Sequence, residues 1–287
     1  MINDDDFIPA RIAIIGLGLM GGSLALALKG RCEKLLAVDI DPATINLARR
    51  NRIVDQISDR MVEILPQADV IILAVPVKSI IQILGQLAKY ISDQAIILDL
   101  GSTKASVCEA MERLPDNLAP VGGHPMCGRE MAGLEHASAA IYRNAPFALV
   151  ACANTTQTAK RVAETIVHLI GAQPIWLDAA THDAWTAATS HLPYLISTAL
   201  IQATPEAASA LIGPGFESTT RLAASSAEVM ADILATNKTN ILDTLQRFQD
   251  TLNILTTALE DEPGQLKENL AAAANKRAVL LASKKQI

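Results

Sequence analysis

Three glycines and one aspartate near the start of the chain have the types and spacing of a nucleotide site. Gly16, Gly18 and Gly21 follow the apolar run of residues 12–15, and Asp39 closes a second apolar run. In such a pattern the first glycine permits a tight turn, the second lets phosphate approach the backbone, and the third lets the next helix pack closely. A carboxylate about 20 residues further on binds ribose hydroxyls. The pattern therefore predicts a dinucleotide site at a helix N-terminus, whose N–H groups face the phosphates.

The residues around this motif refine the predicted cofactor. Asp39 is followed by Ile40 and Asp41, so a negative charge stands where a 2′-phosphate would bind, and no arginine follows to pair with that phosphate. We therefore expect NAD, with NADP less favoured. The predicted cofactor contacts come from the glycine motif and from two later loops: Gly16, Gly18, Leu19, Met20, Gly21, Asp39, Val75, Pro76 and Ser102.

His124 is the strongest candidate for proton transfer. It lies in the glycine-rich segment 122–128, after the fifth predicted strand, and the ordinary pKa of histidine, about 6.5, suits a base near neutral pH. Ser102 follows the fourth strand and is placed to donate to His124 or to a substrate; its alternative role is a helix N-cap. Because ligands bind beyond the carboxyl ends of strands in open α/β sheets, both side chains are expected near the reactive end of the cofactor.

The second half of the chain offers two further binding groups. His191 lies in an otherwise apolar helical stretch, and Arg221 lies in a polar stretch after the break at residues 213–215. A guanidinium there would hold a carboxylate through two parallel hydrogen bonds. The alternatives are a core histidine and an ordinary surface arginine.

Alternating apolar runs and helical stretches must position these groups. We expect strands at residues 12–15, 35–38, 70–75, 95–98, 147–151 and 174–177, with a short strand before Gly122, and helices near 20–29, 42–51, 77–90, 104–113 and 155–170. The strand runs are continuously apolar, as expected of strands covered on both faces. The pattern predicts an α/β fold with an N-terminal doubly wound, Rossmann-type parallel sheet.

From about Ala179 onward the chain reads as helical, with breaks at Pro205, Pro214 and Pro263. We expect a flexible arm over residues 1–9, a dinucleotide-binding domain over 10–178 and an all-helical substrate and dimerisation domain over 179–287. A narrow apolar seam supports helix packing in the last domain: Ile241, Leu245, Phe248, Leu252, Leu255 and Leu259. Because symmetric dimers are the commonest oligomers, we expect a homodimer.

Composition excludes several classes of function. The net charge of −6 and the 3% aromatic content argue against a nucleic-acid partner. No apolar run has the roughly 18 residues of a membrane span, and the acidic N-terminus does not resemble a signal peptide. Four cysteines without metal-ligand spacing indicate no metal site and favour the reducing cytoplasm.

At these segments the chain resembles the prephenate/arogenate dehydrogenase family. The shared segments are Gly16-Leu-Gly-Leu-Met-Gly-Gly-Ser23, Asp99-Leu-Gly-Ser-Thr-Lys104, Gly122-Gly-His-Pro-Met-Cys-Gly128, Ser190-His-Leu-Pro193 and the region of Arg221-Leu-Ala-Ala. The glycine motif is common to many dehydrogenases, whereas the two histidine segments are far more specific. The resemblance implies a nucleotide-binding domain joined to a helical dimerisation domain.

The resemblance also implies a reaction in tyrosine biosynthesis. Hydride would pass from the hydroxyl-bearing carbon of prephenate or arogenate to the nicotinamide, CO₂ would leave, and the ring would become aromatic. His124 matches the family's proton acceptor, Ser102 the serine that orients it, His191 a substrate-positioning histidine, and Arg221 the carboxylate-binding arginine. Many relatives have a small hydroxyl residue in place of Arg129 and a histidine in place of Tyr194, so these two are expected at the substrate side chain.

Two other functions stay open. A β-hydroxyacid-type dehydrogenase would share the glycine motif and the two-domain layout, but it would use a lysine of the helical domain, where lysine occurs only from Lys238 onward. A non-enzymatic nucleotide sensor would keep the fold without the chemistry, because a fold does not fix a function.

Overall fold

The computed structural model describes residues 8–128, 131–261 and 263–284. The chain divides into two compact units, Met1–Asn237 and Lys238–Ile287. The first unit holds the sheet and the helices up to α10, and the second consists of two long helices. Arg129, one of the predicted substrate contacts, lies outside the described residues.

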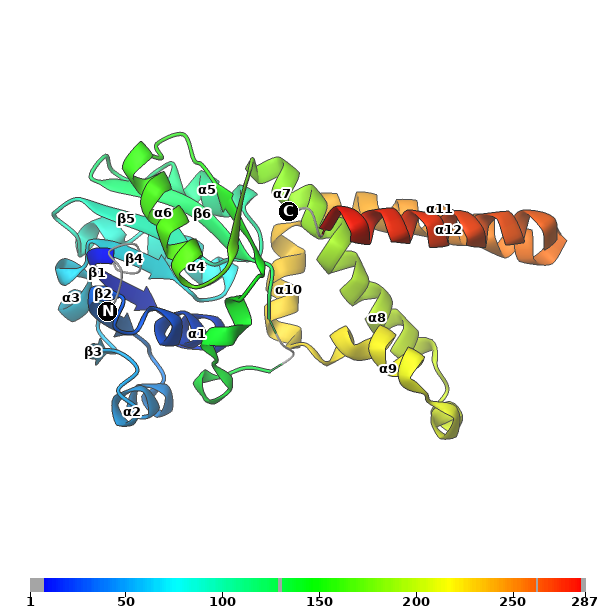
Figure 1. Cartoon of the computed structure of the whole chain (residues 1–287), viewed down its shortest axis with the longest axis horizontal. Helices are drawn as coiled ribbons and strands as arrows, with labels where there is room; N and C mark the ends of the chain where they lie inside the picture. The colour runs from blue at the N-terminus through cyan, green and yellow to red at the C-terminus, as the bar shows by residue number, and fades with distance from the viewer. Residues whose placement is uncertain (1–7, 129–130, 262, 285–287) are drawn as a thin grey trace. The chain divides into compact units, whose positions relative to one another are not determined.

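The described residues of the first unit form an eight-stranded sheet in the order β3-β2-β1-β4-β5-β6-β7-β8 (Figure 1). Its strands are β1 (Ile8–Ile15), β2 (Cys32–Val38), β3 (Gln56–Ser58), β4 (Val70–Leu73), β5 (Ala95–Asp99), β6 (Leu118–Pro125), β7 (Pro146–Val150) and β8 (Gln173–Leu177). Strands β1 to β6 run parallel, which confirms the predicted doubly wound sheet. The order reverses between β1 and β4, and this is the point at which such sheets bind ligands.

Both faces of the sheet are buried, which explains why its strands read as unbroken apolar runs. Along β1, Ile12 and Ile14 point into one core, while Ala13 and Ile15 point into the other. The first core is covered by α1 (Leu19–Leu28), α2 (Pro42–Arg50) and α6 (Gln157–Leu169). The second is covered by α3 (Met61–Ile64), α4 (Val77–Leu84) and α5 (Ala105–Met111). Short 3₁₀ turns complete this part: η2 (Leu65–Gln67), η3 (Leu87–Lys89), η4 (Leu134–His136) and η5 (Ala139–Tyr142).

Helices follow β8 as expected. They are α7 (Ala179–Thr186), a π-helical turn η6 (Ala187–His191), α8 (Leu192–Ala203), η7 (Glu206–Leu211), α9 (Pro214–Thr220), η8 (Arg221–Ala224) and α10 (Ala227–Thr236). α8 ends before Thr204-Pro205, and α9 begins at Pro214, as the sequence predicts. Proline fits the first turn of a helix, where its missing N–H is not needed.

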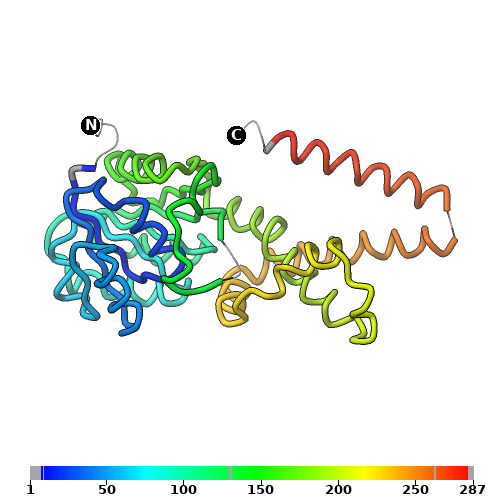
Figure 2. The backbone as a smooth tube through the Cα atoms, turned by 60° about the horizontal axis from the view of Figure 1, so that its bottom comes forward, coloured from blue at the N-terminus to red at the C-terminus, as the bar shows by residue number. Residues whose placement is uncertain are grey.

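The second unit consists of α11 (Lys238–Asp261) and α12 (Pro263–Lys284), which run in opposite directions and diverge toward the C-terminal end of α12 (Figure 2). Leu252 and Leu259 of the predicted seam are exposed on α11, and Leu280 is exposed on α12. No helix among the described residues of the chain is both long enough and apolar enough to cross a membrane.

The structure differs from the predicted strands in four respects. β3 was not expected, because its three residues are too short to give an apolar run. β6 and β7 pair antiparallel, because η4 and η5 link them in place of a crossover helix. His124 lies inside β6, not in a loop after it. β1 begins at Ile8, inside the segment 1–9 expected to be an arm; residues 1–7 lie outside the described residues.

We predict that Gly21→Ala destabilises the first unit. A Cβ at this position would lie 1.9 Å from the Gly16 carbonyl oxygen and 2.9 Å from the Ala74 Cβ, so the helix would have to move off the sheet. Such overpacking costs about 1–3 kcal/mol, measured as the loss of unfolding free energy in urea. Gly18→Ala is the matched control, because its Cβ would meet nothing within 4 Å. Equal stability of the two variants would contradict this account of the glycine motif.

Candidate active site

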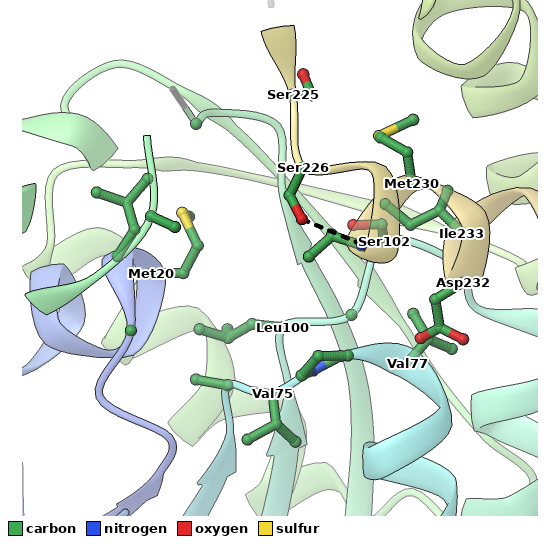
Figure 3. Close-up of a pocket in the computed structure, with 18 of the residues that line it drawn as sticks. Met20, Val75, Val77, Leu100, Ser102, Ser225, Ser226, Met230, Asp232 and Ile233 are labelled. Atoms are coloured by element: carbon green, nitrogen blue, oxygen red, sulfur yellow. Dashed lines mark hydrogen bonds between the residues drawn. The ribbon is translucent and has the colours of Figure 1, made fainter. Parts of the chain in front are cut away.

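A cavity of about 430 Å³ opens at the switch point between β1 and β4 (Figure 3). Its walls come from the start of α1, the loops after β4 and β5, the segment after β6, and α10 with the residues before it. The lining residues are Gly18, Leu19, Met20, Ala74, Val75, Pro76, Val77, Leu100, Gly101, Ser102, Cys127, Gly128, Met131, Ala132, Gly133, Ser225, Ser226, Val229, Met230, Asp232 and Ile233. The volume lies in the range of small-molecule pockets.

The glycine motif fits a dinucleotide at one end of this cavity. Gly18 caps α1 without a side-chain hydrogen bond, and a Cβ there would point into open space. Among the described residues the first turn of α1 carries no acidic side chain, so its unpaired N–H groups suit a phosphate. Asp39 accepts hydrogen bonds from Leu17 N at 2.7 Å and from Asp41 N at 2.9 Å, which fix its carboxylate after β2.

A buried ion pair fixes the two segments that carry Ser102 and His124. The Lys104 ammonium binds the Asp99 carboxylate and donates to the Gly123 carbonyl oxygen at 2.7 Å, and neither charged side chain is exposed. Asp99 also accepts from Gly101 N at 2.7 Å and from Gly123 N at 2.9 Å. One carboxylate therefore holds the loop after β5 and the end of β6 in a single arrangement.

His124 extends past the strand beside it and contacts a second histidine. β6 pairs with β5 only up to Val121, so His124 lies beyond the carboxyl end of β5. Its Nδ1 is 2.9 Å from Nε2 of His182, and Nδ1 of His182 is 2.7 Å from the Asp183 carboxylate. Asp183 in turn accepts from the backbone N–H groups of Lys104 at 2.7 Å and Ala105 at 2.9 Å. The chain His124–His182–Asp183 thus joins β6 to α7 and to the start of α5.

Burial keeps His124 neutral. Desolvation is the main cause that lowers its pKa well below 6.5, and the neighbouring His182, Lys104 and His191 lower it further. Burial also acts to raise the pKa of Asp183, but the hydrogen bonds from His182 and the two backbone N–H groups outweigh it and lower that pKa. The site therefore combines an uncharged imidazole with an ionised carboxylate two hydrogen bonds away.

His191 is a second buried histidine, and the side chain of Asn237 holds its ring. It is 1% exposed and ends the π-helical turn, and its Nδ1 lies 3.2 Å from the Asn237 side-chain nitrogen. That nitrogen also donates to the Asp183 carbonyl oxygen at 2.7 Å, which identifies it as the amide nitrogen. Because an amide nitrogen only donates, Nδ1 of His191 must accept, and its proton lies on Nε2. Burial lowers the pKa of His191 to about 4, against the opposing effect of Asp183.

α10 closes the cavity on the side away from the sheet (Figure 3). Ser226 caps this helix by accepting from Val229 N at 3.5 Å. Asp232 accepts from Lys78 N at the start of α4 at 3.0 Å and lies 3.2 Å from the Lys78 ammonium. Thr236 and Thr103 share a hydrogen bond of 2.9 Å between their hydroxyls. These contacts attach α10 to the start of α4 and to Thr103, just before α5.

The cavity brings together only part of the predicted site. The predicted residues that line it are Gly18, Leu19, Met20, Val75, Pro76 and Ser102. Gly16 lies in the turn after β1 and Gly21 in α1, neither among the lining residues, and Asp39 follows the neighbouring strand β2. His124 and His191 are buried and do not line the cavity, Tyr194 is half-buried on α8, and Arg221 is exposed at the start of η8. Ser197 of α8 accepts from Ala223 N at 3.0 Å and holds η8 against α8.

The sequence alone does not indicate His182, Asp183, Asp99 or Asn237 as site residues. Their roles depend on contacts across 24 to 79 residues of sequence. One signal was present: an adjacent histidine and aspartate in the first two turns of the helix that follows the last strand.

Comparison with known proteins assigns the family. A dinucleotide-binding sheet with this glycine motif is typical of nucleotide-dependent dehydrogenases. Two family models match the chain: the prephenate dehydrogenase nucleotide-binding domain over residues 24–176 and the prephenate dehydrogenase dimerization domain over residues 178–273. The chain belongs to the prephenate dehydrogenase family.

Individual relatives agree with this assignment. A cyclohexadienyl dehydrogenase of Zymomonas mobilis is 30% identical over 88% of this chain and 89% of its own length. A prephenate dehydrogenase of Bacillus subtilis is 29% identical over 88% of this chain and 71% of its own length. The structure of the A. aeolicus prephenate dehydrogenase in complex with hydroxyphenyl propionate and NAD⁺ has a TM-score of 0.88 and 27% identity, and covers 96% of this chain and 99% of that one. The Synechocystis arogenate dehydrogenase has a TM-score of 0.81 and 27% identity, over 94% and 99% of the two chains.

We predict that His191 makes folding sensitive to acid. Its pKa is about 4 in the folded protein against 6.5 for the free side chain, so the unfolded state binds the proton more tightly. Its contribution to the unfolding free energy is complete above pH 6.5 and is lost as the pH falls from 6.5 to 4, by up to about 3 kcal/mol. Urea unfolding at several pH values should give a shallower pH slope for His191→Gln than for the wild type. His168→Gln, at an exposed position on α6, should keep the wild-type slope. If His191→Gln also kept the wild-type slope, the acid sensitivity would not come from His191.

Proposed function

We propose that the protein catalyses the NAD⁺-dependent oxidative decarboxylation of prephenate, arogenate or both, in tyrosine biosynthesis. The observation that carries this proposal is the neutral, buried His124, held beyond the carboxyl end of β5 on the strand that leads into Cys127 and Gly128 of the cavity wall, at the switch point of a dinucleotide-binding sheet. Family membership and the names of the relatives support the same reaction.

The residues of this chain would bind the cofactor as follows. The N–H groups at the start of α1 would hold the pyrophosphate, with Gly18 giving it room, and Asp39 would accept from the ribose hydroxyls. The loops at Val75-Pro76 and Ser102 would face the nicotinamide end. When bound, NAD⁺ supplies the hydride acceptor.

His124 would act first as a base and then as an acid. It accepts the proton of the ring hydroxyl while the carbon that bears this hydroxyl loses its hydride, which forms the ring ketone. When the ring carboxylate leaves as CO₂, its bonding electrons enter the ring and produce a phenolate. The proton held by His124 returns to that oxygen, so the protein ends the cycle unchanged. Ser102 would orient the hydroxyl and His124.

The helices that follow the sheet would bind the rest of the substrate. His191 presents Nε2–H as a donor, and we propose that it positions an oxygen of the substrate. Arg221 would bind a substrate carboxylate, and Arg129 and Tyr194 would contact the side chain that distinguishes a keto acid from an amino acid. We assign the nucleotide-binding domain to residues 10–178 and the substrate and dimerisation domain to residues 179–287.

We propose that the enzyme is a cytoplasmic homodimer. Its four cysteines are free thiols, as is typical of a reducing compartment. The exposed Leu252 and Leu259 on α11 and Leu280 on α12 give an apolar surface suited to a second copy.

The main test measures NADH formation with prephenate and with arogenate. We predict turnover of at least one of them, and a loss of about 10²–10⁴-fold in kcat for His124→Asn, because the base is removed. The dissociation constant of NAD⁺ should stay unchanged, since His124 is not proposed to hold the nucleotide. His168→Asn is the control. Folded wild-type protein that binds NAD⁺ but oxidises neither acid would refute the proposal.

Cofactor choice provides a second test. We predict a higher kcat/KM with NAD⁺ than with NADP⁺, because the Asp39 carboxylate repels a 2′-phosphate. Asp39→Asn keeps an acceptor oxygen and removes the charge, so it should lower the NAD⁺/NADP⁺ ratio of efficiencies by roughly tenfold. Glu33→Gln, at an exposed position on β2, the strand that precedes Asp39, is the control. A wild-type preference for NADP⁺ would contradict the assigned role of Asp39.

A further inference from the structure

The buried chain that ends at His124 begins with a carboxylate that can only accept hydrogen bonds. Asp183 receives N–H donors from Lys104 and Ala105 on its two oxygens, and the lowering of its pKa keeps it ionised. Its side chain is 1% exposed, so solvent does not compete for these bonds. An ionised carboxylate has no proton to give. Nδ1 of His182, 2.7 Å away, must therefore be the donor in that contact.

The proton positions follow from this contact along the chain. In its neutral form His182 carries one proton; with that proton on Nδ1, its Nε2 has a lone pair. That Nε2 lies 2.9 Å from Nδ1 of His124, which must then donate. The two rings meet edge to face, with centroids 5.1 Å apart and an angle of 65° between their planes, so a nitrogen of one ring can point at a nitrogen of the other. His124 is left with its lone pair on Nε2.

We propose that His182, held by Asp183, is a positioning residue that fixes His124 as the Nδ1–H tautomer, with Nε2 ready to accept the substrate's hydroxyl proton. This inference rests on the proposed function, in which His124 is the base. The opposite tautomer would carry its proton on Nε2 and present a donor where the reaction needs an acceptor. In a Ser-His-Asp protease, replacing the aspartate that fixes the tautomer of the catalytic histidine by asparagine lowers kcat by about 10⁴-fold.

The same chain offers an acceptor to His124 after it has taken the proton, because Nδ1–H still faces Nε2 of His182. The Lys104 ammonium opposes a second positive charge on the ring, and two carboxylates lie near it: Asp99, bonded to Gly123 N, and Asp183, bonded to His182. Asp99 is occupied by Lys104, and His191 adds no negative charge. Asp183 is therefore the carboxylate that acts on His124 through His182.

Two substitutions at one position separate the tautomer role from simple packing. His182→Gln can donate its amide N–H to Asp183 and accept from His124 through its amide oxygen, so it preserves the tautomer. His182→Leu fills the space but accepts nothing. We expect His182→Leu to lose about 10²-fold or more in kcat, with KM and the NAD⁺ dissociation constant unchanged, and His182→Gln to stay within about tenfold of the wild type. His168→Leu is the control. Equal losses in both His182 variants would overturn the proposal.

A spectroscopic measurement needs no variant at His182 and no activity. The chain has five histidines, so ¹⁵N-labelled imidazole nitrogens give few signals, and His124→Asn identifies those of His124. We expect His124 in the wild-type protein at pH 8 to show a protonated Nδ1 and an unprotonated Nε2. A protonated Nε2 would overturn the proposal even if the His182 variants fail to fold.

The proposed reaction and the role of His182 are distinguished by different outcomes. If the wild-type protein oxidises neither acid, the proposed function fails, while the tautomer of His124 is still read from the nitrogen signals. If turnover is present and His124 is the Nε2–H tautomer, the function stands and the role of His182 is wrong.

Discussion

The Asp99–Lys104 ion pair is the interaction on which the site depends. Both side chains are fully buried, and a buried charge without its partner is strongly destabilising. Here both members of the pair make further hydrogen bonds: Asp99 accepts from the backbone N–H groups of Gly101 and Gly123, and Lys104 donates to the Gly123 carbonyl oxygen. The loop after β5 and the end of β6 therefore cannot move separately. Ser102 and His124, one on each segment, keep their relative position because of a contact that neither of them makes.

The helices after β8 complete the site by binding the starts of earlier helices. Asp183 of α7 accepts from the first N–H groups of α5, and Asp232 of α10 accepts from Lys78 N at the start of α4. The first N–H groups of a helix have no partner within it, so acids from elsewhere satisfy them. The same two carboxylates also hold parts of the site in place: Asp183 orients His182, and Asp232 fixes α10 against the cavity. The same contacts thus attach the later helices to the sheet domain and position the side chains of the site.

Burial and hydrogen bonding keep the charged groups of the site apart from its two neutral histidines. Desolvation lowers the pKa of His124 and of His191, so both rings stay neutral near pH 7. The ionised groups next to them, Asp99, Lys104 and Asp183, are each paired or capped by N–H donors. The two neutral rings differ in tautomer because their Nδ1 partners differ: a histidine acceptor for His124 and an amide donor for His191. One ring is therefore an acceptor at Nε2 and the other a donor.

The sequence by itself determined the doubly wound sheet, the glycine motif and the change to helices near Ala179, because these depend on local spacing and on apolar runs that local neighbours specify. It also selected His124 and Ser102, whose neighbours in sequence are unusual. It did not indicate β3, whose three residues are too few to form a recognisable apolar pattern. It also did not indicate the antiparallel pairing of β7 with β6, which depends on the path of the chain between these two strands. The roles of His182, Asp183 and Asn237 were decided only by the tertiary structure, because a tautomer is fixed by the hydrogen-bond partner, and each partner here comes from a distant part of the chain.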